Sequence, residues 1–419
     1  MPNQDKLAIN GGEPVRNTPF PASYPGASVY GEEEKKAVME VIDSKSPFRY
    51  YGSNVLGKAK EFENALSQKL GNKYTLGVTS GTAALVVALK AAGIGPGDKV
   101  IVPACTFLAT PGAVICAGAV PIFADIDESM SIDPESISKV VDKYTKAIIP
   151  VPILGNPCQM DRVMQAAKKH NLIVIEDVAQ SCGSKFNGQY SGTFGNINCF
   201  SLQMNKIITT GDGGAVSTND SKLYERAVRY HDQGMFREKE GFLSKSPADD
   251  VFIGQNYRMS EVSGAIALAQ VKKLDFIIES MRKVKYTIKE QIKDIKGLEF
   301  RRINDEAGDA GNALIMLLPN AEINKEFRHA LNGEGIATGM LYNGEPIYML
   351  PQIFNKKTAE NSGFPFNQFN EEIVYTKDMC PASWDIMSRN ALIGLSPTFN
   401  EQDVEDIVKA IRKVASYIL

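Results

Sequence analysis

The sequence predicts an α/β protein in which a large domain, with a mostly parallel sheet flanked by helices, precedes a smaller C-terminal α/β domain. From Lys73 onward, apolar runs of strand length alternate with stretches of helical periodicity. The strand-like runs are apolar throughout, which is typical of parallel strands covered on both faces. The length of 419 residues exceeds what one core of ordinary size organises, so a second, smaller domain is expected.

The expected elements follow one another in a regular order. An extended arm rich in Pro, Gly and Asn, at residues 1–30, leads to two helices at 32–42 and 58–70. The strand-like runs lie at residues 75–79, 99–103, 120–124, 146–153 and 172–176. The helical runs between them lie at residues 82–92, 110–117, 134–141 and 160–170. Ligands bind beyond the carboxyl ends of the strands in such sheets, so the loops after the strands are candidate sites.

Composition argues against several classes of protein. The net charge of −3 comes from interspersed charges, and no basic stripe indicates nucleic-acid binding. The start lacks the regions of a signal peptide, and no apolar run approaches the roughly 20 residues that span a bilayer, so a cytoplasmic protein without a membrane partner is expected. The cysteines show no CxxC spacing and are interpreted as buried, reduced thiols. The three histidines are far apart in sequence, so no metal site is expected.

A single lysine, Lys206, stands between an apolar strand at residues 197–202 and a cluster of glycines at 211, 213 and 214. A buried lysine is costly unless it is paired or neutral, and a neutral lysine is a nucleophile that forms imines. The glycines indicate a sharp turn where the backbone approaches another group. On this stretch alone, the alternative is a lysine at the end of a strand that reaches solvent.

Three candidate loops lie at the expected carboxyl edge of the sheet. The first, residues 79–84, opens a helix whose N-terminal amides and hydroxyls suit a phosphate, although Ser80 or Thr82 could also be an ordinary N-cap. The second places Phe107 just past a strand, where it could stack on a flat ring or belong to the core. The third puts Asp177 after an apolar run. Asp177 could hold a protonated ring nitrogen or cap the next helix.

Together these parts describe one site. It would contain a phosphate cradle, an aromatic ring for stacking, a carboxylate for a pyridinium nitrogen, and a lysine downstream. These are the groups that bind pyridoxal 5′-phosphate, which needs an imine-forming lysine and an acidic partner for its ring nitrogen. The combination is far more specific than any of its parts.

At these same positions the sequence resembles the DegT/DnrJ/EryC1/StrS family of sugar aminotransferases, which have the fold-type I architecture of aspartate aminotransferase. The resemblance covers nearly the whole chain. It is carried by residues 80–85, 103–109, 176–180, 201–214 and 254–258. It implies a large cofactor-binding domain over residues 1–284, in which a helix at 260–274 packs. It also implies a small C-terminal domain over residues 285–419 that closes with a helix at 401–416.

The resemblance also implies roles for individual residues. Lys206 would form the imine, and Asp177 would hold the ring nitrogen. The remaining cofactor contacts would be Gly81, Thr82 and Ser201 at the phosphate, Phe107 stacked on the ring, and Gln180 against the ring and its 3-hydroxyl. In this family the asparagine of the motif that here reads Gly254-Gln-Asn-Tyr-Arg258 reaches the phosphate in the neighbouring subunit. Asn256 therefore implies a homodimer with shared active sites.

Two departures from the family pattern concern the surroundings of the lysine. Gln203 stands where the family usually has histidine, and Asp212 stands where it usually has glutamate. The opening at residues 9–16 resembles the aminocyclitol (scyllo-inosose) branch. Residues 48–51, 387–389 and 395–396 resemble instead the enzyme that aminates 8-keto-3,8-dideoxy-octulosonate for lipopolysaccharide. These similarities conflict and leave the acceptor open.

The expected activity is the transfer of an amino group from glutamate or glutamine to a keto-sugar or sugar-like carbonyl, with 8-keto-3,8-dideoxy-octulosonate as one candidate acceptor. Arg16, Arg49, Tyr50 and Arg389 are predicted contacts of the acceptor, and each could equally be an interface or surface residue. The alternatives of the same class are aminocyclitol and nucleotide-sugar aminotransferases. The alternatives of other classes are a sugar dehydratase that uses pyridoxamine phosphate and a cofactor-binding regulator without catalysis.

Overall fold

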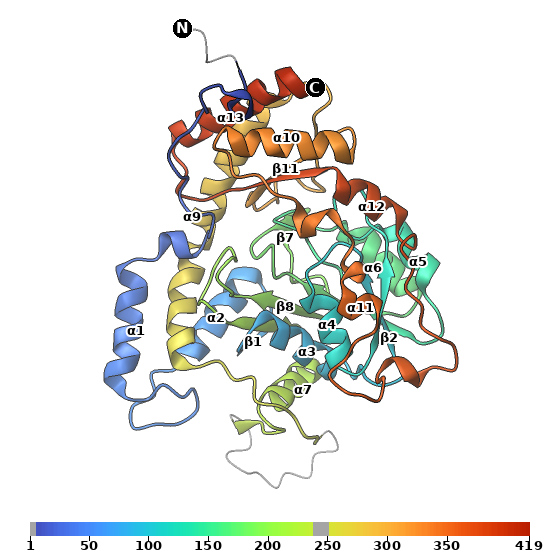
Figure 1. Cartoon of the computed structure of the whole chain (residues 1–419). Coiled ribbons are helices and arrows are strands. Elements are labelled where there is room, and N and C mark those ends of the chain that lie inside the picture. Colours follow the sequence, from blue (N-terminus) through green and yellow to red (C-terminus); the bar gives the residue numbers. More distant parts are fainter. Residues whose placement is uncertain (1–5, 238–250) are drawn as a thin grey trace.

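The computed structural model describes residues 6–237 and 251–419, so residues 1–5 of the expected arm lie outside the described residues. Figure 1 shows a lower part built around a central sheet and an upper part that contains the C-terminal helix. The long helix α9, Glu261–Ile292, runs from one part into the other.

The larger sheet has the strand order β1-β9-β8-β5-β4-β2-β3. Its strands are β1 Tyr74–Val78, β2 Lys99–Pro103, β3 Val120–Ala124, β4 Thr145–Ile148, β5 Ile173–Asp177, β8 Ile197–Ser201 and β9 Gly214–Thr218. β9 pairs antiparallel with both β1 and β8, and the other pairings in this sheet are parallel. The short strands β6 Lys185–Phe186 and β7 Gln189–Tyr190 form a separate hairpin. A mostly parallel sheet was predicted, and its carboxyl edge collects the loops after β1, β5 and β8.

One predicted strand is shorter than expected. The apolar run at 146–153 predicts a strand, but β4 ends at Ile148. Pro150 and Pro152 follow, and a proline has no N–H to donate to a ladder. The segment after β4 is nevertheless buried, up to and including Ile153. It therefore continues toward the carboxyl edge of the sheet with only two further backbone hydrogen bonds to the neighbouring strands among the described residues: Ile149 N–H donates to the carbonyl of Ile101 at 2.8 Å, and Asp177 N–H donates to the carbonyl of Pro150 at 3.0 Å.

Helices cover the sheet and form the upper part of the molecule. They are α1 Glu32–Ser44, α2 Lys58–Leu70, α3 Gly81–Ala91, α4 Ala109–Cys116, α5 Pro134–Val140, α6 Met160–Lys169, α7 Ser221–His231, α10 Ala321–Gly333, α11 Pro351–Phe354, α12 Pro381–Ser388 and α13 Glu401–Ile418. α3 is apolar on nearly all sides because it lies between the sheet and other helices. Its N-cap Ser80 accepts a hydrogen bond from the N–H of Ala83 at 3.0 Å.

α9 extends well beyond the helix expected at residues 260–274. Buried apolar side chains continue at a spacing of about four residues, at Ile277, Met281, Val284, Ile288 and Ile292. The expected division between residues 284 and 285 therefore falls inside a continuous helix. The division into domains 1–284 and 285–419 stays a prediction.

The second sheet has the order β10-β11-β12, with antiparallel pairs. Its strands are β10 Glu299–Phe300, β11 Ala313–Leu317 and β12 Asn390–Gly394. Alternate residues of β11 face different cores: Leu314 and Met316 pack with α10 and α13, whereas Ala313 and Ile315 belong to the core of the large sheet. The two-residue period of a strand thus joins the upper and lower parts.

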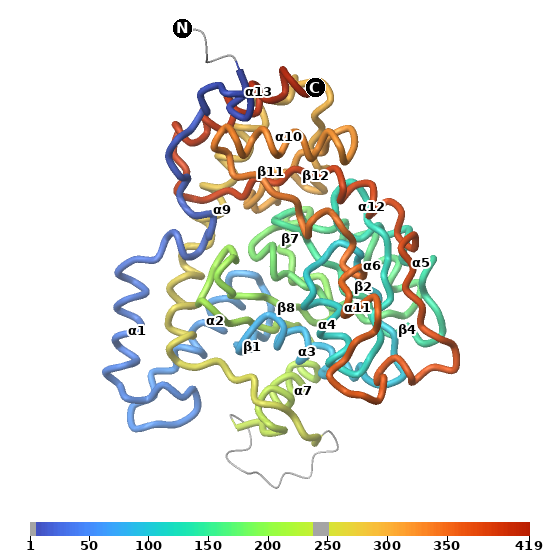
Figure 2. The backbone as a smooth tube through the Cα atoms, in the orientation of Figure 1, coloured from blue at the N-terminus to red at the C-terminus, as the bar shows by residue number. Residues whose placement is uncertain are grey.

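The C-terminal segment between α10 and β12 returns to the large sheet. Its buried side chains Leu341, Tyr348, Phe366 and Met387 belong to the same core as α3 and β2. Figure 2 shows this segment running down the side of the lower part before the chain rejoins the upper part. Residues from the C-terminal half therefore reach the neighbourhood of the large sheet.

The N-terminal arm is held by the upper part. Leu7 is buried there, and the carboxylate of Glu334 accepts hydrogen bonds from the N–H groups of Ala8 and Val15. The arm contains the short 3-10 helices η1 Ala8–Asn10 and η2 Ala27–Val29, so it is less extended than predicted.

The structure bears on three of the predictions made from composition: membrane spans, metal sites and cysteines. Over residues 6–237 and 251–419, no helix combines the length and apolar character needed to cross a membrane. In the same ranges, no group of histidine, cysteine and acidic side chains could hold a metal ion. Five of the six cysteines are buried and none is in a disulfide, but Cys116 is exposed, so the prediction of a buried thiol is wrong there. Cys116 is the last residue of α4, where the chain emerges at the surface.

Candidate active site

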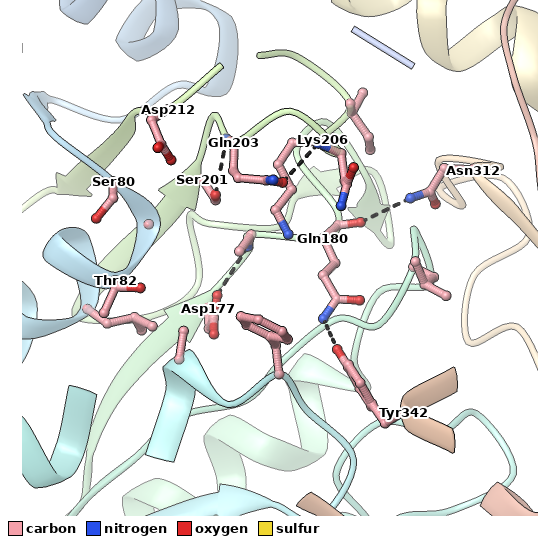
Figure 3. A pocket seen from close by; sticks show the side chains of 18 of the residues that line it. Ser80, Thr82, Asp177, Gln180, Ser201, Gln203, Lys206, Asp212, Asn312 and Tyr342 are labelled. Atoms are coloured by element: carbon pink, nitrogen blue, oxygen red, sulfur yellow. Dashed lines mark hydrogen bonds between the residues drawn. The ribbon is translucent and has the colours of Figure 1, made fainter. Parts of the chain in front are cut away.

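A cavity of about 460 Å³ lies at the carboxyl edge of the large sheet. Its lining comes from the first turn of α3, the start of α4, the ends of β5 and β8, the loop after β8, and three segments from elsewhere. The lining residues are Ser80, Gly81, Thr82, Leu85, Phe107, Ala109, Leu154, Asp177, Ala179, Gln180, Ser201, Gln203, Asn205, Lys206, Ile207, Asp212, Asn312, Leu341 and Tyr342. Figure 3 shows the labelled side chains gathered around one space.

Lys206 enters the cavity from the loop after β8. The loop is closed by backbone hydrogen bonds from Leu202 N–H to Gly213 and from Met204 N–H to Gly211. The N–H of Lys206 donates to the carbonyl of Gln203 at 2.9 Å, so the lysine sits in a tight turn. Burial lowers the pKa of Lys206, and the carboxylate of Asp177 opposes this shift. A larger share of neutral amine, the nucleophilic form, follows.

Asp177 ends β5 and is buried at the floor of the cavity. One carboxylate oxygen accepts a hydrogen bond from Thr110 Oγ1 at 2.7 Å, and the other accepts one from the N–H of Ala179 at 3.2 Å. Burial raises the pKa of Asp177, while these hydrogen bonds and the charge of Lys206 work in the opposite direction. A cation placed against this carboxylate would offset the cost of its burial.

The first turn of α3 and the end of β8 approach each other closely. A Cβ atom at Gly81 would lie 2.6 Å from the Cβ of Ser201, so only glycine fits at that position. A Cβ atom at Gly214 would lie 2.4 Å from the carbonyl oxygen of Ser80. The packing leaves the N–H groups at the N-terminus of α3 beside the hydroxyls of Thr82 and Ser201 on the cavity wall. Such an arrangement suits an anion.

Aromatic and amide groups form the opposite side of the cavity. Phe107 is 57% exposed, although it is a large apolar side chain. Gln180 donates a hydrogen bond from Nε2 to the hydroxyl of Tyr342 at 2.6 Å. The rings of Phe107 and Tyr342 are 6.4 Å apart. The face of Phe107 is therefore available to a flat group held between the lysine and the carboxylate.

The structure brings together most of the predicted cofactor residues. Lys206, Asp177, Gly81, Thr82, Phe107, Gln180 and Ser201 all line the cavity. The sequence analysis missed Leu154, Asn312, Leu341 and Tyr342, which come from the loop after β4 and from the C-terminal half. No local pattern marks these four residues, because only the fold carries their segments to the cavity.

Five other predicted site residues do not line the cavity of this chain. Asn256 is exposed, and its Oδ1 accepts a hydrogen bond from the N–H of Arg258 at 3.4 Å. Arg49 is buried in an ion pair with Glu63 at 2.7 Å. The three remaining residues have partners in the same chain: Arg16 contacts Asp403 and Asp406, Tyr50 contacts His231, and Arg389 contacts Asp385.

Each of these contacts within the chain accounts for the position of the side chain without any contact to a substrate. The prediction that Arg16, Arg49, Tyr50 and Arg389 contact the acceptor is therefore not supported by the cavity of the single chain. Arg49 is the clearest case, because its guanidinium also donates to the carbonyl of Gly77 at 3.2 Å and holds β1.

Comparison with known proteins identifies the family of this chain. The model of the DegT/DnrJ/EryC1/StrS aminotransferase family matches residues 29–412. The chain belongs to this family. The GDP-perosamine synthase of Escherichia coli O157:H7 is 35% identical over 359 residues, which cover 82% of this chain and 93% of the relative. The L-glutamine:2-deoxy-scyllo-inosose aminotransferase of Streptomyces kanamyceticus is 28% identical and covers 100% of this chain and 99% of the relative.

Solved structures of similar fold agree. Helicobacter pylori PseC, an aminotransferase involved in the biosynthesis of pseudoaminic acid, has a TM-score of 0.79 and 26% identity, over 95% of this chain and 100% of that chain. A GDP-4-keto-6-deoxymannose-3-dehydratase with a trapped PLP-glutamate geminal diamine has a TM-score of 0.78 and 25% identity, over 95% of this chain and 100% of that chain. The predictions of the family, the fold-type I architecture, the aminotransferase class and pyridoxal phosphate as cofactor are confirmed.

Proposed function

We propose that this chain transfers an amino group from L-glutamate or L-glutamine to the carbonyl of a keto-sugar, with Lys206 as the residue that binds the cofactor covalently. The observation that carries the proposal is the shared cavity of Lys206 and Asp177, in which the lysine has a lowered pKa and the carboxylate is buried. A family that contains sugar and aminocyclitol aminotransferases supplies the substrate class.

The residues present fit pyridoxal phosphate. The N-terminus of α3 with Thr82 and Ser201 would hold the phosphate, Phe107 and Gln180 would flank the ring, and Asp177 would pair with the ring nitrogen. When bound, the cofactor supplies an electron sink that makes the α-proton of the donor acidic, and it carries the nitrogen between the two half-reactions.

Lys206 is the group that moves protons in this proposal. Its Nζ, once displaced by the amino donor, is a free amine with a lowered pKa inside the cavity. Such an amine would accept the proton from the α-carbon of the donor as general base and then hold it for return as general acid. In the second half-reaction the same amine would move a proton in the opposite direction and so protonate the carbon that was the carbonyl carbon of the keto-sugar. The net exchange converts glutamate and the ketone into 2-oxoglutarate and the amino sugar.

Asp177 keeps the ring nitrogen protonated in this proposal. The hydroxyl of Thr110 and the N–H of Ala179 hold the carboxylate in place from two directions. A buried carboxylate without a cation is costly. A protonated ring nitrogen would be a cation in direct contact with this carboxylate, and the pairing would stabilise both charges.

The charge balance of the cavity supports a shared site. Lys206 is the one lysine or arginine among the described residues that line the cavity. A phosphate and the carboxylates of a donor bring more negative charge than one lysine offsets. We infer that a second copy of the chain completes the site, with Asn256 near the phosphate of its neighbour. Asn256 is exposed and does not line the cavity of its own chain, which supports this role.

The proposal leaves three classes of acceptor to be separated by experiment. The candidate indicated by residues 48–51, 387–389 and 395–396 is 8-keto-3,8-dideoxy-octulosonate. The relative that makes GDP-perosamine favours a nucleotide-linked keto-sugar, and the scyllo-inosose relative favours a keto-cyclitol. The carboxylate of octulosonate and the diphosphate of a nucleotide-linked keto-sugar would each need a cation beyond Lys206, whereas a keto-cyclitol would not.

The deciding experiment is an absorbance spectrum of the purified protein before and after L-glutamate is added. The expected result is a near-visible band that disappears with glutamate and release of 2-oxoglutarate, or that disappears with glutamine and release of 2-oxoglutaramate. Return of the band then identifies the acceptor in a panel of keto-octulosonate, nucleotide-linked keto-sugars and keto-cyclitols. The Lys206→Ala variant is the control and should lack both the band and turnover.

Two other outcomes would overturn the proposal. A band that persists with every amino donor would favour a cofactor-binding regulator. Loss of a hydroxyl group from a keto-sugar, without net amination, would favour the dehydratase class to which one similar structure belongs.

A further inference from the structure

The loop between β4 and α6 contains a strained turn that lines the cavity. The N–H of Asn156 donates to the carbonyl of Ile153 at 3.1 Å, and the two residues between them, Leu154 and Gly155, have φ values of 44° and 82°. Positive φ at both central residues is the pattern of a type I′ turn, which prefers Asn-Gly. Leucine is disfavoured at such a φ. Another group must therefore hold Leu154 in this conformation.

The side chain of Arg301 supplies that group. Its guanidinium donates to the carbonyl of Ile153 at 2.7 Å and to the carbonyl of Leu154 at 3.0 Å. Arg301 follows β10 and is 2% exposed. Burial lowers its pKa to about 10, so it is charged at neutral pH. A buried, charged guanidinium that donates two hydrogen bonds to the carbonyls of one turn fixes the backbone path of that turn.

The turn at Leu154 and Gly155 also contacts the backbone of Gln180. The N–H of Gly155 lies 3.2 Å from the carbonyl of Gln180 and 2.9 Å from Ser181 Oγ, and it donates to both. Ser181 Oγ donates to the carbonyl of Pro152 at 2.6 Å, which closes the connection. Asn312 Nδ2 also reaches the carbonyl of Gln180, at 3.4 Å. The position of Gln180 in the cavity thus depends on the turn.

Gly155 has little freedom to relax. A Cβ atom at this residue would lie 2.4 Å from Asn312 Oδ1, and its carbonyl accepts the N–H of Ala310 at 3.0 Å. Residues 301–312 therefore enclose the turn from the side of the second sheet. The Nε of Arg301 has no partner among the described residues, so the guanidinium makes no other polar contact than the two carbonyls.

We propose that Arg301 is a positioning residue, which holds the turn at Leu154 and Gly155 and through it sets Gln180 in the cavity. The proposal rests on the proposed function only in what Gln180 faces. Arg301 touches no residue of the reaction itself and acts through the backbone of the turn. Its removal should release Leu154 from its left-handed conformation and let Gln180 move.

The test compares Arg301→Met with Arg302→Met in the cofactor-loaded protein. Arg302 is the matched control, because it is exposed and pairs with Asp127 and Glu128 at the surface. Hydrogen exchange should be about tenfold faster in the Arg301 variant within residues 150–157 and 178–182, and unchanged elsewhere. The pH midpoint of the near-visible band should shift, and kcat/KM for the amino donor should fall about tenfold. Arg302→Met should change none of these.

A second variant tests the route of the effect. Asparagine tolerates positive φ, so Leu154→Asn added to Arg301→Met should restore slow exchange at residues 178–182. Unchanged exchange in both segments of Arg301→Met would overturn the proposal, and so would a uniform increase across the chain. If Arg301→Met does not fold, Arg301→Lys replaces it, because lysine keeps the charge but not the planar fork. Absence of transamination in the unmodified protein would refute the proposed function, while the exchange data would still decide the role of Arg301.

Discussion

Lys206 and Asp177 show how burial alone adjusts two side chains for opposite tasks. The same desolvation disfavours the charged form of each, so it lowers the pKa of the lysine and raises that of the aspartate. Each charge partly offsets the shift of the other. A cofactor with a cationic ring nitrogen would shift this balance toward an ionised Asp177 and leave the lysine amine neutral.

Substitution of Asp177 tests its role. Asp177→Asn keeps the size of the side chain and an oxygen that can accept the hydrogen bond of Thr110. Without the negative charge, the ring nitrogen loses its partner, and kcat should fall on the order of 100-fold. The melting temperature of the cofactor-free variant should not fall below that of the unmodified protein, because the buried carboxylate costs free energy in the chain alone. An unchanged kcat would contradict the role of Asp177.

The lowered pKa of Lys206 predicts a pH-dependent stability. In the cofactor-free protein the folded state binds this proton less tightly than the unfolded state, whose lysine has a pKa of 10.5. The lowered pKa therefore reduces the free energy of unfolding. This reduction is full below the folded-state pKa of Lys206 and vanishes as the pH rises toward 10.5.

The Lys206→Met variant removes this reduction. It should melt at a higher temperature than the unmodified protein at neutral pH, and the difference should shrink as the pH rises. Thermal unfolding followed by circular dichroism at several pH values measures this. A difference that grows with pH would show that the sign is wrong.

At the scale of elements, the site depends on how closely α3 approaches β8. Serine at the N-cap and glycine at the next position let the first turn of the helix pack on the end of the strand. Both features are local in sequence, and the motif at residues 79–84 indicated them. The choice between a phosphate cradle and an ordinary cap depended on Ser201, which only the sheet brings beside Gly81.

Gly81→Ala tests this approach. The added Cβ would lie 2.6 Å from Ser201 Cβ, so the helix must shift away from β8. Affinity for pyridoxal phosphate should fall at least about tenfold, since a displacement of this kind disturbs every contact of the anion. Equilibrium titration followed by absorbance measures the affinity.

Gly112→Ala is the control for this substitution. Gly112 lies in α4, where an added Cβ meets nothing within 4 Å. Alanine is a better helix former than glycine, so this variant should be slightly stabilised with unchanged affinity. A loss of affinity in both variants would point to a general effect of the substitution.

At the scale of the whole molecule, the cavity is completed by parts of the chain that are distant in sequence. β11 faces both cores, and the segment between α10 and β12 returns to the large sheet with Leu341 and Tyr342. Lys206 is the single cationic side chain among the described residues of the lining, and we propose that a further part of the site comes from a second copy. This inference has a direct test.

Mixing two inactive variants should restore activity if the sites are shared. Lys206→Ala inactivates the cavity of the subunit that carries it. Asn256→Ala removes the proposed contact that its subunit makes with the cavity of the neighbouring subunit. In a mixed dimer, one site then has both residues intact. Random exchange of subunits should recover about a quarter of the unmodified activity, because half of the dimers have one intact site of two. Activity is measured before and after subunit exchange, and no recovery would contradict a contribution of Asn256 across the interface.

The sequence by itself determined the α/β class, the alternation of strands and helices along the chain from β1 to β5, and the residues at the ends of β5 and β8. Periodicity and strand-end chemistry are local, so Lys206 and Asp177 could be found without coordinates, and the family resemblance indicated Gln180 and Ser201. The tertiary structure decided the extent of α9, the end of β4 before Pro150, and the cavity wall of Leu154, Asn312 and Tyr342. It also showed that Arg49 serves an ion pair with Glu63. Contacts between segments far apart in the chain depend on packing, and packing leaves no periodic signal in either segment.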